Sequence, residues 1–498
     1  MLILIIITIV IAWLLADHYK RRRRLPPGPI SIPLIGNLHQ IAYYTWKTGG
    51  VVEMMDAFRK KYGNVFTLWL GPVPAVNLAD YESAHEAMVK HGHKYADKYL
   101  SPLFAYTRNN RGVLMTNGEA WSVQRRFALQ TLRSMGMGKD VMEARIIDEL
   151  DDRFADIDEM AVDGITTIKA NELFDVTVGS IINGVLSGER FGKRPEAFWE
   201  LKAHLEANQK RLTPFQMMMP LWAMKLLYKN EIDLLAKNRQ RVIDYVGRDA
   251  VKRIEEVRAG RRVINKANAD DFIDAYILRM LEEEEEGTSN HFNVDELKAV
   301  LLDLWIAGQE TTATTLCSGV LHLLHHPEEM RKIRDELHVV TDSSTRRLSL
   351  KDRVRTPYLN ATLAEIQRHA SILSVNFWRV NDEPIVIAGH PIDAGAIVAA
   401  QLSVLHRNET VFVGDCDAFR PSRFVDDEQL ASRVIPFGIG KRACLGEGLA
   451  RAELYLILGN LLLRYELRPH GELPKIENVM KLSILKKPPK YDLEFVKL

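Results

Sequence analysis

Apolar residues recur at helical spacing along most of the chain, and this pattern predicts a mainly helical protein. The spacing is clearest over Pro195–Arg211, Glu231–Ala259, Val294–Leu324 and Glu447–Tyr465. Segments that resemble strands are few and short, namely Val65–Leu70, Ala75–Leu78, Pro384–Ile387 and Ala396–Leu402. No Gly/Ser linker and no repeat of fixed period interrupts the pattern. We therefore expect one large α-helical body with small β-sheets.

The first sixteen residues, MLILIIITIVIAWLLA, carry no charge and are followed by DHYKRRRR and LPPGP. As a helix this run would rise about 24 Å, slightly less than the roughly 27 Å core of an endoplasmic-reticulum membrane. A cleaved secretory signal would place its basic residues before the apolar run, whereas here they follow it, which favours a retained anchor. The expected organisation is an anchor over 1–16, a basic and Pro-rich hinge over 17–40, and the main body over 41–498.

The composition of the 498 residues is that of a globular protein, with 47% hydrophobic and 26% charged residues. The formal net charge of +1 gives no electrostatic case for a nucleic-acid partner. Three cysteines, Cys317, Cys416 and Cys444, are too few for a disulfide framework, so we expect the body to lie in a reducing compartment.

The middle of the long apolar segment Val294–Leu324 reads AGQETT, which suits a buried helix poorly. Gly308 costs about 1 kcal/mol relative to alanine, and an ionised Glu310 in a dry core needs a partner or water. At the start of the segment, Asn293 is the expected N-cap, with Glu296 placed to close a capping box. The AGQETT stretch is either a tolerated bend or an opening beside a bulky group, and the acid next to threonines favours the opening.

Cys444 stands between glycines in FGIGKRACLGEGLA, directly before an apolar run. It could be a buried structural cysteine, but Lys441, Arg442 and a helix amino end would all favour the thiolate. Gly440 and Gly446 would let a flat group approach the backbone. Zinc is disfavoured because no further Cys or His lies at ligand spacing, and a nucleophile would need a His partner. A haem iron needs a single protein ligand.

A dinucleotide fingerprint also overlaps this stretch. Gly438, Gly440 and Ala443 spell G-x-G-x-x-A, and Glu466 lies at about the spacing of a ribose contact. The short tail after Glu466 cannot supply the remaining strands and helices of a doubly wound sheet, so we reject this interpretation.

Phe437, Gly440, Arg442, Cys444 and Gly446 fit F-x-x-G-x-R-x-C-x-G, the haem-binding signature of the cytochromes P450, and the chain resembles that family along its whole length. Other motifs of the family follow in order: PPGP, Trp121 with Arg125, Ala307 to Thr312, Glu365 with Arg368, and Pro421, Arg423 and Phe424. Glu255/Arg258 and Glu328/Arg331 also fit E-x-x-R, but position along the chain singles out Glu365. The pattern is most similar to animal microsomal enzymes, and to nematode members in particular.

The resemblance implies the P450 fold, a single large helical haem-thiolate domain behind an N-terminal transmembrane anchor. It implies haem b (iron protoporphyrin IX) with Cys444 as the metal ligand. The other expected cofactor contacts are Trp121, Arg125, Arg379, Arg442, Phe437, Gly440, Gly446 and Ala307. Glu365, Arg368 and Arg423 would form a buried structural triad. The segment before Arg379, SILSVNFW, departs from relatives, which often carry prolines there.

The implied reaction inserts one atom of O₂ into a small lipophilic substrate and releases the other as water, with Thr311 and Glu310 delivering protons. NADPH would supply electrons through NADPH–cytochrome P450 reductase, with cytochrome b5 as a further donor, docking on a basic face at Lys441, Arg126 and Arg133. The implied location is the endoplasmic-reticulum membrane, with a single-pass anchor and the catalytic domain in the cytosol. The alternatives are a P450-like isomerase or dehydratase acting on peroxides, and a non-enzymatic haem- or lipid-binding protein. The Glu310–Thr311 pair argues against both.

By analogy with the family, the substrate pocket is apolar and has no obvious ion anchor. Its expected lining is Phe104, Tyr106, Ile306, Ala307, Val375, Phe377 and Met480. Such a pocket fits fatty acids, related lipids or foreign lipophiles. The Met-rich segment Thr213–Leu227 either dips into lipid or caps the core.

Overall fold

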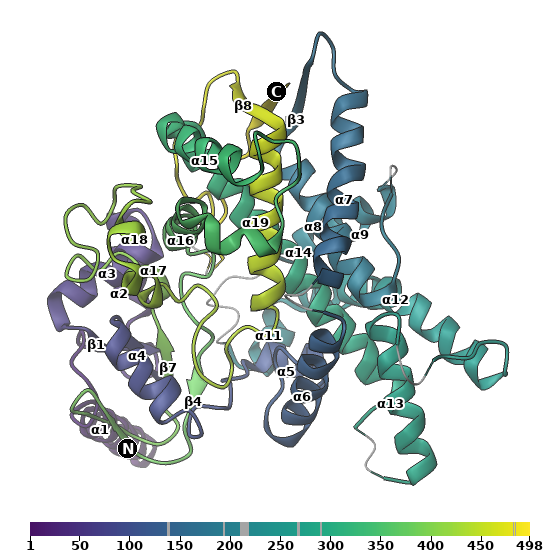
Figure 1. Ribbon diagram of the computed structural model, residues 1–498. Helices are drawn as coiled ribbons and strands as arrows, with labels where there is room; N and C mark the ends of the chain where they lie inside the picture. The colour runs from purple at the N-terminus through teal and green to yellow at the C-terminus, as the bar shows by residue number, and fades with distance from the viewer. Residues whose placement is uncertain are drawn as a thin grey trace.

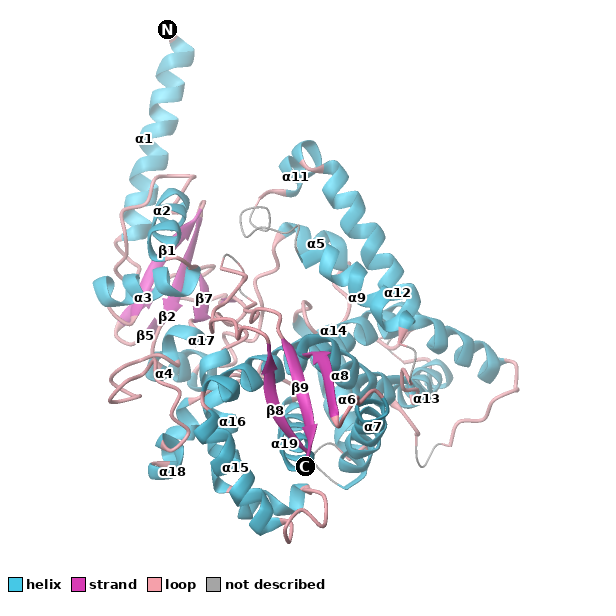
Figure 2. Ribbon diagram, turned by 90° about the horizontal axis from the view of Figure 1, so that it is seen from above, coloured by secondary structure: helices cyan, strands magenta, loops and turns pink. Residues whose placement is uncertain are grey.

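The computed structural model describes residues 1–136, 140–192, 195–209, 219–265, 269–288, 291–481, 483 and 485–498. Helices make up most of this part of the chain, with small sheets at two edges of the helical body (Figures 1 and 2). The prediction of a mainly helical protein with small sheets is confirmed.

The predicted long helices correspond to four observed ones, with ends that differ by a few residues. The helices are α1 (Leu2–Arg22), α2 (Leu38–Thr48), α3 (Val51–Tyr62), α4 (Tyr81–His85), α5 (Pro102–Arg108), α6 (Gly118–Ser134), α7 (Asp140–Glu159), α8 (Ala170–Ser187), α9 (Glu196–Gln209), α11 (Leu221–Leu227), α12 (Lys229–Arg258), α13 (Phe272–Glu286), α14 (Val294–His325), α15 (Pro327–Val340), α16 (Pro357–Ala370), α17 (Leu402–Leu405), α18 (Arg423–Asp426) and α19 (Glu447–Arg464). The predicted end of α9, at 210 and 211, lies outside the described residues.

The larger sheet has the strand order β1-β2-β7-β4. Its strands are β1 (Val65–Leu70), β2 (Val73–Leu78), β7 (Ile397–Ala400) and β4 (Arg379–Val380). β2 runs antiparallel to β1 and parallel to β7, while β4 runs antiparallel to β7 with Arg379 opposite Val398. This pairing holds Arg379 at the edge of the sheet that borders the helical body.

The second sheet joins distant parts of the chain in the order β3-β9-β8, and a separate hairpin pairs β5 with β6. The strands are β3 (Ile165–Lys169), β5 (Ile385–Ile387), β6 (His390–Ile392), β8 (Tyr465–His470) and β9 (Asp492–Lys497). α19 ends at Arg464, one residue earlier than predicted, because Tyr465 already pairs with Lys497 in β8 and β9.

α14 crosses the interior and packs against α8, α12, α16 and α19. Its apolar residues surround the helix, so it is buried on all sides. In the fully described stretch from Glu296 to Leu324, Ala307 is the one exposed residue. The Asn293 side chain caps the helix by accepting the Glu296 backbone N–H at 2.9 Å, as predicted. The Glu296 carboxylate, expected in a capping box, instead accepts the Gly112 N–H at 2.8 Å and ties the loop after α5 to α14.

α1 leads away from the body, and its last turns rest on β1 (Figure 2). The His18 ring lies 2.7 Å from the Ser31 hydroxyl through Nε2 and 4.4 Å from the Trp69 ring centre, and Arg21 stacks over the same indole. None of the helices, taken over their described residues, combines the length and apolar character needed to span a bilayer. The membrane-spanning anchor therefore stays a prediction.

Candidate active site

The loop that carries Cys444 is closed by its own backbone, since the Cys444 N–H donates to the Phe437 carbonyl at 2.9 Å. Gly440 has φ +79°, and a Cβ there would lie 1.9 Å from the Met88 carbonyl oxygen. The absent side chain of Gly440 thus permits a close backbone contact with Met88. Its predicted role in the approach of a flat group stays a prediction. A Cβ on Gly446 would lie 4.0 Å from the Cys444 sulfur, so this glycine does border the thiol.

The Cys444 thiol lies deep in the protein, and yet its side chain is accessible. Burial raises the pKa of the Cys444 thiol and outweighs the Gly446 N–H that bonds the sulfur. Glu447 raises this pKa further, while Arg125 and Lys98 lower it. A side chain that is both accessible and enclosed by protein borders an internal hollow.

The cations predicted to favour the thiolate were Lys441 and Arg442, and this prediction is wrong in its detail. Lys441 is exposed, and Arg442 turns toward backbone carbonyls. The cations that lower the pKa of the thiol are Arg125 and Lys98. They come from α6 and from the segment before α5, which the loop motif alone could not reveal.

Arg442, Arg125 and Trp121 form one packed group beside the cysteine loop. Arg442 Nε donates to the Ala96 carbonyl at 2.6 Å, and its guanidinium lies 3.5 Å from the Trp121 ring centre. Arg125 Nη2 donates to the Ala443 carbonyl at 2.6 Å. The predicted pairing of Trp121 and Arg125 one turn apart on α6 therefore places both against the loop.

Four buried N–H donors around this group find no acceptor within the described ranges: Trp121 Nε1, Arg379 Nη1, Arg442 Nη1 and Asn376 Nδ2. Leaving a buried donor unpaired costs about 1–3 kcal/mol each. The pKa values of Arg379 and Arg442 are lowered to about 9, chiefly by burial and in part by neighbouring guanidinium groups. Unpaired donors and uncompensated cations fit a dianionic group, and the haem propionates are such a group.

Two residues of this rim were not anticipated from the sequence, Lys98 and Asn376. Lys98 is 5% exposed, and its ammonium donates to the Leu114 carbonyl at 2.8 Å and lies 4.3 Å from the Phe377 ring centre. Burial lowers the pKa of Lys98 well below its usual range, and Arg379 and Arg442 lower it further. No local motif distinguishes Lys98, and Asn376 lies in the segment that departs from relatives.

On α14, Ala307 is exposed and Thr311 is half-buried, whereas Gly308 packs against a neighbouring helix. The Thr311 hydroxyl donates to the Ala307 carbonyl at 2.6 Å, the backbone bond expected for a threonine in this stretch. A Cβ on Gly308 would lie 2.9 Å from the Ile182 side chain of α8. Gly308 therefore permits close packing of two helices.

Glu310 forms ion pairs and also borders a cavity that opens to solvent, which together meet the need of a buried carboxylate for a partner or water. It forms ion pairs with Lys202 of α9, at 3.7 Å, and with Lys487 near the C-terminus. Burial would lower the pKa of Lys487, but Glu310 outweighs it and holds that pKa above its usual value. Glu310 also lines a cavity of about 410 Å³ that opens to solvent, and Thr311, the next residue, lies outside that lining. Neither lysine could be predicted from the sequence as a partner of Glu310, because neither stands in a motif.

Comparison with known proteins decides the family. The family model described as cytochrome P450 matches residues 26–495, nearly the whole chain. The chain belongs to the cytochrome P450 family. It is therefore a haem monooxygenase, and neither the isomerase nor the non-enzymatic alternative is favoured.

The relatives are similar over almost their full lengths. The chain is 44% identical to the probable cytochrome P450 cyp-35D1 of Caenorhabditis elegans, over 96% of both chains. It is 31% identical to cytochrome P450 2B2 of Rattus norvegicus over 99% of both, and 30% identical to cytochrome P450 2C70 of the same animal over 96% of both. The predicted resemblance to animal P450s, including a nematode member, is confirmed.

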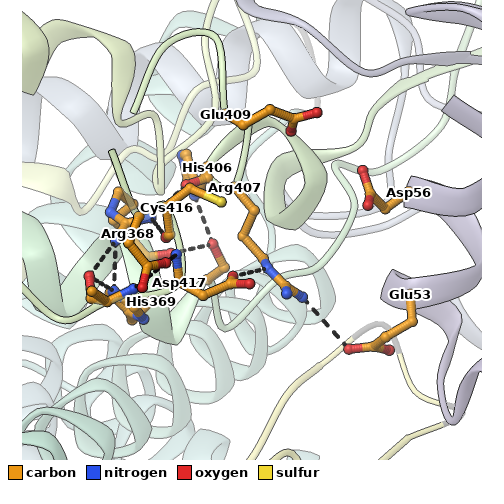
Figure 3. Close-up of polar contacts among 12 residues, drawn as sticks. Glu53, Asp56, Arg368, His369, His406, Arg407, Glu409, Cys416 and Asp417 are labelled. Carbon is orange, nitrogen blue, oxygen red and sulfur yellow. Dashed lines mark hydrogen bonds and ion pairs between the residues drawn. The ribbon is translucent and has the colours of Figure 1, made fainter. Parts of the chain in front are cut away.

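The E-x-x-R motif of this P450 forms the buried triad that was predicted. Arg368 Nε donates to Glu365 at 2.7 Å and Arg423 Nε at 3.1 Å. Burial alone would raise the pKa of Glu365, but hydrogen bonds from Arg368 and His369 hold it well below its usual range. Arg368 also donates to the carbonyls of His406 and Cys416, which binds α16 to the segment before the cysteine loop (Figure 3).

His406 connects this triad to the cysteine loop. Its Nε2 accepts the Ile435 backbone N–H at 2.9 Å, two residues before Phe437, and its Nδ1 lies 2.6 Å from the Ser371 hydroxyl. Accepting at Nε2 requires the neutral ring. The pKa of His406 is lowered to about 3, chiefly by burial and in part by Arg368.

Acid is therefore expected to destabilise this P450. His406 and His322, whose pKa burial lowers to about 2, stay neutral in the folded state but take up protons near pH 6.5 when the chain unfolds. Their stabilisation is present above pH 6.5 and is lost as the pH falls, by about 2.5 kcal/mol for the pair between pH 7 and 5.5. Urea titrations at the two pH values measure this. His322→Phe, which keeps the ring stacked on Phe419, should remove about half of the effect, and an unchanged pH dependence would contradict the assignment.

The predicted pocket residues differ in exposure, and one of them borders a different cavity. Phe104, Ile306, Val375 and Phe377 are half-buried. Tyr106 is exposed on α5 beneath the Lys225 ammonium of α11, 4.4 Å from its ring centre. Met480 lines the 410 Å³ cavity beside Glu310.

Proposed function

We propose that Cys444 ligates haem iron and that the enzyme inserts one atom of O₂ into a lipophilic substrate, with electrons from NADPH supplied by a partner protein. The observation that carries the proposal is the accessible Cys444 thiol in the interior, beside four unpaired buried donors. Haem, when bound through a thiolate, supplies the activation of O₂.

Residues of this chain hold the cofactor in the proposal. Arg379, Arg442 and Trp121 donate their unpaired N–H groups to the propionates, with Asn376 beside them. Arg125, hydrogen-bonded to the loop, adds positive charge near the sulfur. The Gly446 N–H donates to the sulfur and stabilises its anionic form.

Protons enter from the 410 Å³ cavity in this proposal. Glu310 lines that cavity and exchanges protons with its water, while Lys202 and Lys487 hold the carboxylate in place. Thr311, one residue on, presents its hydroxyl beside the exposed Ala307 and passes the proton into the hollow.

Thr311→Ala is expected to retain haem but to form several-fold less product per NADPH, with the remaining electrons released as hydrogen peroxide. The reason is that the substitution removes the hydroxyl that delivers protons. The matched control is Thr315→Ala, one turn later, where the hydroxyl makes the same bond to the Thr311 carbonyl at 2.9 Å but is buried. Equal product per NADPH in Thr311→Ala and the unmutated enzyme would contradict the role of Thr311.

In this proposal the chain consists of a membrane anchor (1–16), a hinge (17–40) and the haem domain (41–498). The anchor lies in the endoplasmic-reticulum membrane and the haem domain in the cytosol.

Exposed apolar side chains support attachment to the membrane: Trp222, Leu226 and Leu227 on α11 and Trp46 on α2. Figure 2 shows α1, α2 and α11 on the same side of the molecule. Ala223 and Met224 of α11 are buried, so this helix caps the core and also offers a face to lipid. Residues 213–218 of the predicted Met-rich segment lie outside the described residues.

The electron donor is proposed to be NADPH–cytochrome P450 reductase, with cytochrome b5 as a second donor, docking beside the cysteine loop. Lys441, Arg126 and Arg133 are exposed there, and over the described ranges the structure pairs none of them with an acid. Lys441→Gln combined with Arg133→Gln is expected to slow reduction several-fold at low ionic strength, and high salt should erase the difference. Stopped-flow reduction measures the rate. Lys169→Gln on β3, a surface cation paired with Glu172, is the control, and a rate indifferent to salt would exclude electrostatic docking.

The test of the function is incubation with reductase, NADPH, a lipophilic acid or ester and isotopically labelled O₂. One labelled oxygen atom in the product is the expected result. A rearranged product without label would instead indicate isomerase chemistry.

A further inference from the structure

Three charged residues from three helices meet above α14. Arg108, the last residue of α5, donates to Asp303 of α14, which is 1% exposed. The second carboxylate oxygen of Asp303 accepts the backbone N–H groups of Val113 at 2.9 Å and Leu114 at 2.8 Å. The Asp303 carboxylate thus accepts three hydrogen bonds, one of them from the Arg108 guanidinium that neutralises its charge, so it is already satisfied.

The third residue is Arg239 of α12, which has no such partner. Its Nε is fully buried and finds no acceptor anywhere in the described part of the chain. The pKa of Arg239 is lowered to about 10, chiefly by burial and in part by the Arg108 charge, and Asp303 compensates only in part. Two guanidinium groups share one carboxylate, so one positive charge is left over.

The half-buried Arg239 lies within electrostatic range of Asp303, close to the exposed turn of α14. Arg239 is one turn beyond Leu235, on the face of α12 that packs against Leu103 of α5. Asp303 is one turn before the exposed Ala307 on α14, about 6 Å along the helix axis. Figure 2 shows α5 and α12 beside α14, on the side of α11. The cluster therefore lies about one helical turn from Ala307, within reach of a substrate that approaches this residue.

We propose that Arg239 binds the carboxylate of the substrate, so that the substrates of this site are lipophilic carboxylic acids. This inference rests on the proposed monooxygenase function. The cations at the haem rim are assigned to the propionates, whereas Arg239 lies near Arg108 of α5 and Asp303 of α14. The half-buried Phe104 and Ile306 leave the rest of the site apolar. In this proposal the pocket has an ion anchor that the sequence analysis did not foresee, because no sequence motif marks Arg239.

Equilibrium dialysis of the holoenzyme with dodecanoic acid and with methyl dodecanoate tests the anchor. A charge-assisted hydrogen bond predicts that Arg239→Gln weakens binding of the acid by about 10- to 100-fold and leaves the ester unchanged. Arg239→Lys, which keeps the charge, should retain most of the preference. Arg241→Gln, an exposed arginine two residues further along α12, is the matched control and should bind both ligands normally.

Product position provides a second readout that loss of packing would not produce. If the carboxylate is anchored, decanoic, dodecanoic and tetradecanoic acids should be oxygenated at the same carbon counted from the carboxyl group. In Arg239→Gln this constancy should disappear. Oxygenation at a constant distance from the methyl end would overturn the proposal.

Equal affinity of the unmutated enzyme for the acid and the ester would also overturn the proposal. Because this comparison needs no variant, it remains decisive even if Arg239→Gln fails to fold. Failure of this inference is distinct from failure of the proposed function. Methyl dodecanoate oxygenated as well as the acid refutes the anchor alone, whereas no labelled product from any of these probes refutes the monooxygenase.

Discussion

Cys444→Ser is expected to reduce NADPH-dependent product formation to the background of free haem. A serine hydroxyl does not ionise under conditions where a thiol can, so the variant offers iron no thiolate. Product formation with reductase and labelled O₂ measures the loss, and the absorption spectrum should change with it.

Cys416→Ser is the matched control for this prediction. Cys416 is half-buried, and its contact with Arg368 is made through the backbone carbonyl, which the substitution leaves in place. Normal turnover in Cys416→Ser, together with its loss in Cys444→Ser, is the expected pair of results. Appreciable turnover by Cys444→Ser would show that another side chain ligates the iron.

The second large effect is expected from Glu365→Gln. This substitution should lower the free energy of unfolding by about 3–5 kcal/mol, because it leaves Arg368 and Arg423 buried without their carboxylate. Against a typical stability of about 5–15 kcal/mol, this loss should leave little folded haem protein at growth temperature. The yield of haem-loaded protein and its thermal midpoint are the measurements.

Glu328→Gln tests whether position or motif decides this effect. Glu328 and Arg331 also fit E-x-x-R, but both are exposed on α15. The substitution should change stability by no more than about 0.5 kcal/mol, as is usual for exposed positions. Equal losses in the two variants would contradict a special role for the Glu365 triad.

The long helices could be predicted from the sequence because their apolar residues recur at helical spacing over many turns. α14 was recognisable because apolar residues occupy all sides of the helix. The two-residue strand β4 was not foreseen. Two residues carry no periodic signal, and β4 exists because Arg379 pairs with Val398 of β7. That pairing depends on the folded arrangement of distant segments.

For the site, motifs located the residues that lie within a few positions of one another, such as Cys444 with Arg442, or Trp121 with Arg125. They did not reveal Lys98, Lys202 or Lys487, whose partners come from other parts of the chain. Local reasoning also did not reveal the close contacts of Gly308 with Ile182 and of Gly440 with Met88, because these neighbours belong to distant elements.

The most direct test of the account is the spectrum of the reduced, purified protein under carbon monoxide. The account predicts the long-wavelength absorption band of a thiolate-ligated haem, present in the unmutated protein and absent from Cys444→Ser. A band typical of imidazole ligation, or a colourless protein after expression with ample haem precursor, would contradict the assignment of Cys444 as the iron ligand.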